Sequence, residues 1–275
     1  MRASETSKQG KAVTPLESLE RLKKQTNFEA WPLKEHQFLP GFSPKTTSLL
    51  SAKEYALERE RLLPVISSCT ARAYFYAQVQ SRSAFELTVL VGHKSARDAA
   101  EALLLQIVYT QMHSEPRVVS AGSPLGEVTI YLHPDLKQSV AFVRNNVALS
   151  IQNYSSGPAQ PDLNAIAMEI DRRLRESPAV PSLAADPRVP RITRFEPRTA
   201  VVRPGERTDL EIEVRDDYPP LEYLLRAEHG SCNLDPTQSR WYFRAGPVKS
   251  KAEVALTVVN QINLMAEMRR LITIE

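Results

Sequence analysis

The chain has 275 residues, and its 35 lysines and arginines nearly balance its 32 aspartates and glutamates, which leaves a formal net charge of +3. This balance is typical of a mixed, solvated surface, so we expect no nucleic-acid partner. The 20 prolines against 9 glycines argue against a glycine-rich, phosphate-binding enzyme core. The length is sufficient for two domains plus a tail.

Targeting and redox signals leave the compartment open. No run of about 18 apolar residues is present, so we expect no transmembrane span. The basic N-terminus has no apolar stretch after it, so the chain is cytoplasmic as written, or extracytoplasmic if it begins downstream of an export signal. Cys69 and Cys232 fall in different predicted domains, and two free thiols are favoured over a disulfide between them.

Residues 1–47 predict a flexible leader, because Lys, Ser, Thr and Pro dominate and no periodicity is sustained. Leu16, Leu19 and Leu22 have the spacing of one short helical face. Trp31 and Phe38 lie in a proline-broken run. Two alternatives remain for that run: it packs against a neighbouring surface, or it is disordered.

Residues 48–177 predict an α+β domain, and its first element is read as a helix. Ser51 with Glu54 three residues later is a capping-box pattern, and Pro64 supplies a stop, so the pattern predicts a helix over residues 51–63.

Two strands and a helix follow. Apolar residues alternate over residues 73–79 and again over 85–91, which predicts a hairpin with its turn around residues 80–83. Ser95 and Asp98 then have the positions of a helix N-terminus, and a broad apolar stripe follows them.

The same order recurs in the second half of this domain. Strands are predicted at residues 128–132 and 140–151, the latter folded back at Asn145 and Asn146, because asparagine tolerates the left-handed backbone of a tight hairpin turn. Asp162 is the predicted cap of the next helix. Each half thus reads strand, strand, helix, and we predict an antiparallel sheet with both helices packed on one face.

The last third predicts an all-β module. Residues 178–190 are rich in proline and predict a semi-rigid interdomain linker, where limited proteolysis should release two folded pieces. Over residues 191–275, short alternating strands separated by turn residues predict a β-sandwich. Trp241 alternates with Phe243 in the run RWYF, so we expect it to face the core.

Several motifs in this module follow a recognisable order. They are FEP at the end of the first strand, a PGE turn before LEIEV, the aromatic strand RWYFRAGP and the closing LITIE. Over about 85 residues this order resembles a bacterial immunoglobulin-like module of the PKD or cadherin-like kind, which implies an immunoglobulin-like β-sandwich. Related cadherin-like modules hold calcium with acidic residues, but Asp216 and Asp217 stand nearly alone here. The penultimate loop, NQINLMAEM, also departs from the usual Asp/Gly-rich turn.

No pattern predicts a catalytic residue, a metal site or a cofactor. The histidines have no helical metal-pair spacing, and Cys-x-x-Cys, G-x-S-x-G, Walker A and dinucleotide fingerprints are missing from the sequence. His229 and Cys232 lie close together in EHGSC, but turn chemistry explains that stretch without a nucleophile. The five histidines are His36, His93, His113, His133 and His229.

One binding surface is predicted. If Phe75 faces the helices, Tyr74 and Tyr76 stand on the opposite face of the sheet, and an open face that bears tyrosines is a candidate binding surface. The alternative is that the leader, with Trp31 and Phe38, covers this face.

These patterns favour a non-enzymatic binding or structural protein, of bacterial and envelope-associated type, with a protein or glycan partner. A cytoplasmic scaffold or assembly protein is one alternative. A hydrolase whose site assembles only in the fold is the other, and a pocket with two or more converging titratable groups would favour it.

Overall fold

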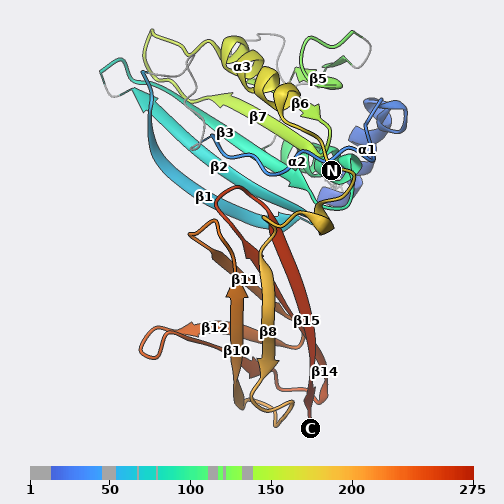
Figure 1. Cartoon of the computed structure of the whole chain (residues 1–275), viewed down its shortest axis with the longest axis vertical. Helices are drawn as coiled ribbons and strands as arrows, with labels where there is room; N and C mark the ends of the chain where they lie inside the picture. The colour runs from blue at the N-terminus through green and yellow to red at the C-terminus, as the bar shows by residue number, and fades with distance from the viewer. Residues whose placement is uncertain are drawn as a thin grey trace, which may run out of the picture.

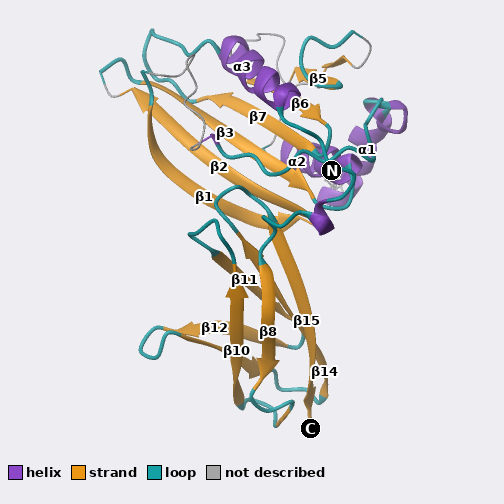
Figure 2. Cartoon of the chain, viewed as in Figure 1, coloured by secondary structure: helices purple, strands orange, loops and turns teal. Residues whose placement is uncertain are grey.

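The computed structural model has two parts (Figure 1). A seven-stranded antiparallel sheet with the helices forms one end of the molecule, and two four-stranded sheets form the other. Figure 2 shows that the α-helices lie only in the first part. The chain is therefore mostly β, with antiparallel sheets and three α-helices among the residues described. Those residues are 14–44, 54–66, 68–78, 80–110, 117–119, 122–131 and 139–275.

The large sheet has the strand order β1-β2-β3-β7-β6-β5-β4. The two halves of the domain meet at its centre, where β3 pairs with β7. The strands are β1 (Ala56–Ile66), β2 (Cys69–Gln78), β3 (Ser83–Gly92), β4 (Arg117–Val119), β5 (Val128–Tyr131), β6 (Ser139–Arg144) and β7 (Val147–Asn153).

The helix predicted over residues 51–63 is wrong from Ala56 onward, where β1 runs along the edge of the sheet; residues 51–53 lie outside the described part. The segment is rich in good helix formers, but helix propensity is a weak local preference. Pairing with β2 over registers such as Glu60 opposite Tyr74 gives the backbone of β2 its second partner. Pro64 is compatible with this position because β1 is an edge strand.

The two long helices lie on opposite faces of this sheet, so the prediction that both pack on one face is wrong. Val89 of β3 packs in the core that includes α3 (Leu163–Glu176), whereas Leu90 packs in the core that includes α2 (Ala96–Tyr109). Neighbouring residues of a strand point to opposite faces, so the two cores are separated by the sheet. Every residue of β3 is buried as a result.

Several predicted local features are confirmed. The Ser95 side chain accepts a hydrogen bond from the Asp98 amide at the start of α2, and Asp162 accepts one from Ala165 at the start of α3. The β6–β7 hairpin turns at Asn145, whose φ of 51° is left-handed. The β2–β3 hairpin also forms as predicted.

The described part of the leader, residues 14–44, packs against the sheet. A capping box between Thr14 and Glu17 begins α1 (Pro15–Gln25), and the 3-10 helix η1 (Phe28–Ala30) follows. Leu19, Leu22, Phe28 and Trp31 join the α2 core. Of the two alternatives for the run containing Trp31 and Phe38, this part of the chain takes the packed one.

The C-terminal part has two sheets, with strand orders β12-β13-β10-β8 and β11-β14-β15-β9. Both sheets contribute to one apolar core, in which Phe243 and Leu256 are fully buried. The strands are β8 (Arg191–Pro197), β9 (Val201–Val202), β10 (Arg207–Arg215), β11 (Glu222–Ala227), β12 (Gly230–Asp235), β13 (Arg240–Ala245), β14 (Ser250–Val259) and β15 (Met265–Ile274).

Residues 178–190 connect the two parts and are partly packed. They contain the 3-10 helix η4 (Leu183–Ala185), and Leu183 is buried together with Phe38 and Leu264. Val180 forms a β-bridge with Phe38. The predicted domain boundaries and the release of two folded pieces by proteolysis stay predictions. In the described part of the chain, no helix is both long and apolar enough to cross a membrane.

Candidate functional site

Tyr74 and Tyr76 are buried, with 0% and 8% of their surface exposed, so the predicted open face that bears them is wrong. Both point to the face that carries α3, where Leu39 and Phe42 of the leader complete the core. Phe75 points to the α2 face. The leader does cover the tyrosines, as in the alternative, but with Leu39 and Phe42 in place of Trp31 and Phe38.

Tyr74 instead leads to a buried polar cluster at the joint between the two halves of the molecule. The β14–β15 turn, residues 260–264, inserts into this joint. Asn260, Asn263 and Leu264 are each 0% exposed. The Asn263 side-chain amide donates to the Tyr74 hydroxyl at 3.1 Å and to the Phe42 carbonyl oxygen at 2.7 Å.

Arg72 of β2 is the charged centre of the joint and is 3% exposed. Its Nε donates to Asn263 Oδ1 at 2.7 Å, and its Nη1 donates to Glu60 Oε1 at 2.6 Å. The same Nη1 meets Glu222 of β11 at 2.5 Å. A buried guanidinium is costly unless it is paired and hydrogen-bonded. Arg72 therefore depends on carboxylates from both halves of the molecule.

Thr70 and His93 extend the joint by one layer. The Thr70 hydroxyl donates to the Asn263 carbonyl oxygen at 2.8 Å, so its remaining capacity is to accept. His93 Nε2 lies 3.3 Å from that hydroxyl and therefore carries the proton. Burial lowers the pKa of His93 to about 3, because the charged imidazolium is disfavoured away from water.

Further contacts hold the same β14–β15 turn in place. Asn260 donates from Nδ2 to the Arg188 carbonyl oxygen at 2.9 Å and to Asp216 Oδ2 at 3.2 Å. Gly41 approaches the turn so closely that a Cβ at this position would lie 2.6 Å from the Ile262 carbonyl oxygen, and its φ of +40° is left-handed. The β14–β15 turn is thus contacted by β2, by the leader and by the segment that connects the two parts.

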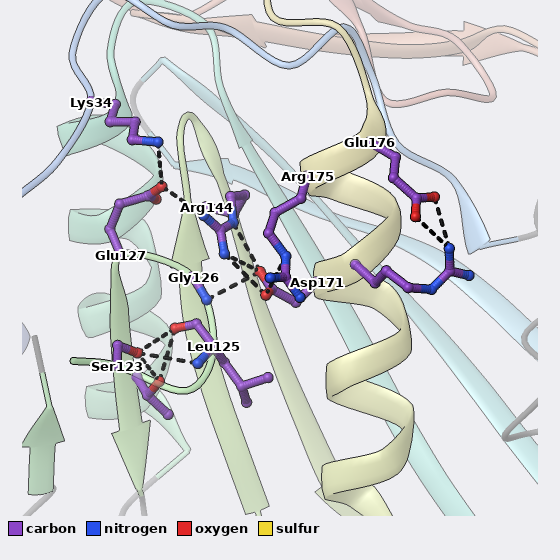
Figure 3. Close-up of polar contacts among 11 residues, drawn as sticks. Lys34, Ser123, Leu125, Gly126, Glu127, Arg144, Asp171, Arg175 and Glu176 are labelled. Carbon is purple, nitrogen blue, oxygen red and sulfur yellow. Dashed lines mark hydrogen bonds and ion pairs between the residues drawn. The ribbon is translucent and has the colours of Figure 1, made fainter.

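A second charged cluster links α3 to the β6–β7 turn (Figure 3). Arg144 donates to both oxygens of Asp171, from Nε at 2.9 Å and from Nη2 at 3.0 Å. The Gly126 amide donates to Asp171 Oδ1 at 3.1 Å, and Arg144 Nη1 donates to Glu127 Oε1 at 3.1 Å. The other Glu127 oxygen accepts from the Asn145 amide at 2.7 Å.

These bonds decide what the Asp171 cluster can do chemically. Each oxygen of Asp171 and Glu127 already accepts a hydrogen bond, and the Asp171 side chain is only 1% exposed. A general base needs a lone pair within reach of a bound substrate. The cluster is best explained as the support that orients the β6–β7 turn against α3.

A hollow lies on the surface of the C-terminal part. It has a volume of about 600 Å³ and is lined mainly by residues of β10, with others from β8, β13 and β11. Leu210, Ile212, Tyr223 and Trp241 supply its apolar surface. Trp241 is partly buried and packs against the C-terminal core, on the face predicted from its alternation with Phe243. Its remaining lining is Arg194, Arg198, Asp209, Glu211, Glu213, Ser239 and Arg240.

The thiols and histidines do not converge in the part of the chain that is described. Cys69 and Cys232 are free, and burial raises the pKa of both, that of Cys232 to about 11. No group of three or more His, Cys, Asp or Glu side chains within the described ranges could hold a metal ion. His113 and His133 lie outside those ranges.

Sequence reasoning missed Arg72, Asn263 and Asn260 as joint residues. The available signal was the β14–β15 turn, whose apolar and amide side chains depart from the usual Asp/Gly-rich pattern. Ile262 and Leu264 would have no apolar surface to contact in an exposed turn, whereas in this buried turn they pack in an apolar cluster.

No protein-family model matches this chain, and no curated protein matches it. Function therefore has to be inferred from the geometry of the described residues.

Proposed function

We propose that the protein is a non-enzymatic binding protein whose C-terminal part, an immunoglobulin-like β-sandwich, is held in a fixed orientation against the α+β part. The sandwich presents a partner-binding edge, and the α+β part is the base on which it stands. The arrangement of two four-stranded sheets around a single apolar core supports the immunoglobulin-like assignment.

The observation that carries this proposal is the joint around Arg72. A flexible connection would leave such groups in water, where each keeps its solvation. Here Arg72 and Asn263 are withdrawn from water and depend on partners in both halves. Any change in the angle between the halves would leave a buried charge or amide without its bonds, at a cost of about 1–3 kcal/mol for each group.

The non-enzymatic part of the proposal is supported by how the carboxylates are used. The buried pair Asp171 and Glu127 is occupied by structural hydrogen bonds. In the hollow, Glu211 and Glu213 are exposed and both lie within ion-pair distance of Arg194. Hydrolysis of chromogenic esters or glycosides that survives purification and is lost in Glu213→Gln would contradict it.

Fixed orientation can be measured with two spin labels. Met168 on α3 and Leu271 on β15 are 55% and 63% exposed, so Met168→Cys and Leu271→Cys accept labels without entering a core. Cys232→Ser removes the more accessible native thiol, whereas Cys69 is buried.

We expect a single narrow distance distribution between the labels, and a broad one when Asn263→Ala is added. Asn233→Ala is the matched control, because Asn233 is an exposed asparagine whose side-chain amide donates to the Ser231 hydroxyl of the same strand at 3.1 Å. A broad distribution in the protein without the joint substitution would overturn the proposal.

A further inference from the structure

The strand β10 has a free edge along its second half. On one side it pairs with β8 along nearly its whole length. On the other side it pairs with β13 only from Arg207 to Leu210. From Glu211 to Arg215, no strand in the described part of the chain pairs with this second side.

The edge is open because β13 begins late. β13 begins at Arg240, which the register of the two strands places alongside Glu211, and the residues before Arg240 turn back into β12. In Figure 1 the β12 hairpin projects sideways from the rest of the C-terminal part. Five residues of strand span about 17 Å. Unpaired N–H and C=O groups over such a length are a template for an added strand.

The surface next to this edge is apolar where an added strand would point inward. Ile212 and Tyr223 are partly buried and line the hollow, and Trp241 stands at its end. Leu234 of β12 lies opposite Trp241 and is 47% exposed. An apolar side chain from a ligand would complete this half-covered core.

The outward-facing side chains set the charge of the ligand. Glu211 and Glu213 alternate with Ile212, their side chains are 44% and 63% exposed, and they share one cation, Arg194. Glu211 lies directly opposite Glu196 of β8, whose carboxylate accepts hydrogen bonds from Arg270. Opposite charges on adjacent strands stabilise a sheet and like charges destabilise it. Two carboxylates that share one arginine leave a negative charge on this face, so an added strand gains from basic residues there.

The space fits one extended chain better than a second copy of this protein. The free edge is bounded by the β12–β13 hairpin at one end. At the other end is the joint, where Asp216 is bound to Asn260. An antiparallel β10 from a second copy would bring its own hairpin against the joint, because that hairpin lies on the same edge of β10.

We propose that the β10 edge from Glu211 to Arg215 binds an extended peptide by strand addition, and that the peptide alternates basic and apolar residues. This inference rests on the proposed function and names the partner chemistry of the same sandwich. Backbone hydrogen bonds supply affinity in this mode of recognition, and alternate side chains supply specificity.

The test uses fluorescent eight-residue peptides and the full chain. The probe alternates lysine and valine, one control alternates glutamate and valine, and a second keeps the lysine–valine composition but places like residues in pairs. We expect the alternating lysine peptide to bind at least tenfold more tightly than either control. The net charge of the chain is +3, so overall attraction cannot supply this preference.

Two sets of variants locate the site. Glu211→Lys with Glu213→Lys should reverse the preference toward the glutamate peptide, and both positions are exposed, so folding is retained. Trp241→Ala should weaken binding about tenfold. Glu253→Lys with Glu267→Lys, a similar reversal on the other sheet, is the matched control and should leave the preference unchanged.

Hydrogen exchange provides a readout that does not depend on substitution. Bound peptide should slow the exchange of β10 amides at residues 211–215. Absence of binding at 1 mM peptide, equal binding of the lysine and glutamate peptides, or protection confined to another strand would overturn the inference. So would a dimer whose formation is blocked by the Glu211 and Glu213 substitutions.

The failure of this inference is distinguishable from failure of the proposed function. A narrow label distance without peptide binding keeps the rigid two-part architecture and removes the β10 site. Peptide binding with a broad label distance keeps the site and removes the rigid joint.

Discussion

Replacing Asn263 with alanine is the most direct perturbation of the joint. The substitution removes three side-chain hydrogen bonds, of which the one from Arg72 is charge-assisted. Two neutral bonds at about 1 kcal/mol each and one charged bond at about 2 kcal/mol give about 4 kcal/mol. Asn263 also has a left-handed φ of 64°, which costs alanine about 1 kcal/mol more. We expect a total loss of about 5 kcal/mol.

The two tryptophans make the assay informative, because one lies in each half. Trp31 packs in the α2 core, and Trp241 packs beside the C-terminal core. Unfolding in urea, followed separately in Trp31→Phe and Trp241→Phe backgrounds, reports on each half. With an m-value of about 3 kcal/mol/M, Asn263→Ala should lower both midpoints by about 1.7 M.

Three results bear on this reasoning. A shift of less than about 0.3 M would show that the joint bonds contribute little beyond what water supplies in the unfolded chain. A shift reported by only one tryptophan would show that the halves unfold separately. Asn233→Ala should stay within about 0.5 kcal/mol of the parent protein, because it lies on the surface.

Three further outcomes are expected. Asp171→Asn breaks the buried pair with Arg144 and should cost about 3 kcal/mol, or about 10 °C in melting temperature by calorimetry; an unchanged melting temperature would contradict the bonding in Figure 3. The pKa of His93 in the folded protein lies below its unfolded value near 6.5. The contribution of His93 to the free energy of unfolding is therefore complete above pH 6.5 and falls toward pH 3, by at most about 1.4 kcal/mol per pH unit. His93→Gln should flatten this slope when the unfolding midpoint is measured as a function of pH. EDTA should leave the melting temperature unchanged, whereas a calcium- or zinc-dependent stabilisation, about 2.7 kcal/mol at a hundredfold excess over Kd, would show a metal site.

Local chemistry in the sequence was sufficient for most of the individual elements. The hydroxyl of Ser95 and the carboxylate of Asp162 identify helix starts because each can bond an otherwise unpaired amide of the first turn. Asn145 identifies a hairpin because few side chains tolerate its left-handed backbone. These signals act within a few residues and need no knowledge of the rest of the chain.

The faces of the large sheet required more than alternation. The strands at its centre read FELTVLV, VAFV and VALSI, and such nearly continuous apolar runs are typical of strands buried on both sides. A prediction based only on the alternation of apolar residues places both helices on one face of the sheet and Tyr74 on the exposed face. The continuous runs were the signal that helices would cover both faces.

The strand β1 shows the limit of local propensity. Its residues prefer a helix, but the edge of β2 offers backbone partners that a helix at this position would leave unpaired. These partners lie in another strand, so no short window of sequence contains the whole interaction.

The joint and the β10 edge were decided by tertiary structure alone. Arg72 and Asn263 are separated by 191 positions and meet only when the β14–β15 turn reaches β2. The free edge depends on where β13 begins relative to β10, which is a matter of register between strands. The sequence by itself determined the helix caps, the hairpin turns and most of the elements, because caps and tight turns rest on bonds between near neighbours. Only the tertiary structure determined which polar groups are buried together at the joint and which backbone edge of β10 stays exposed to water. Both depend on contacts between distant segments.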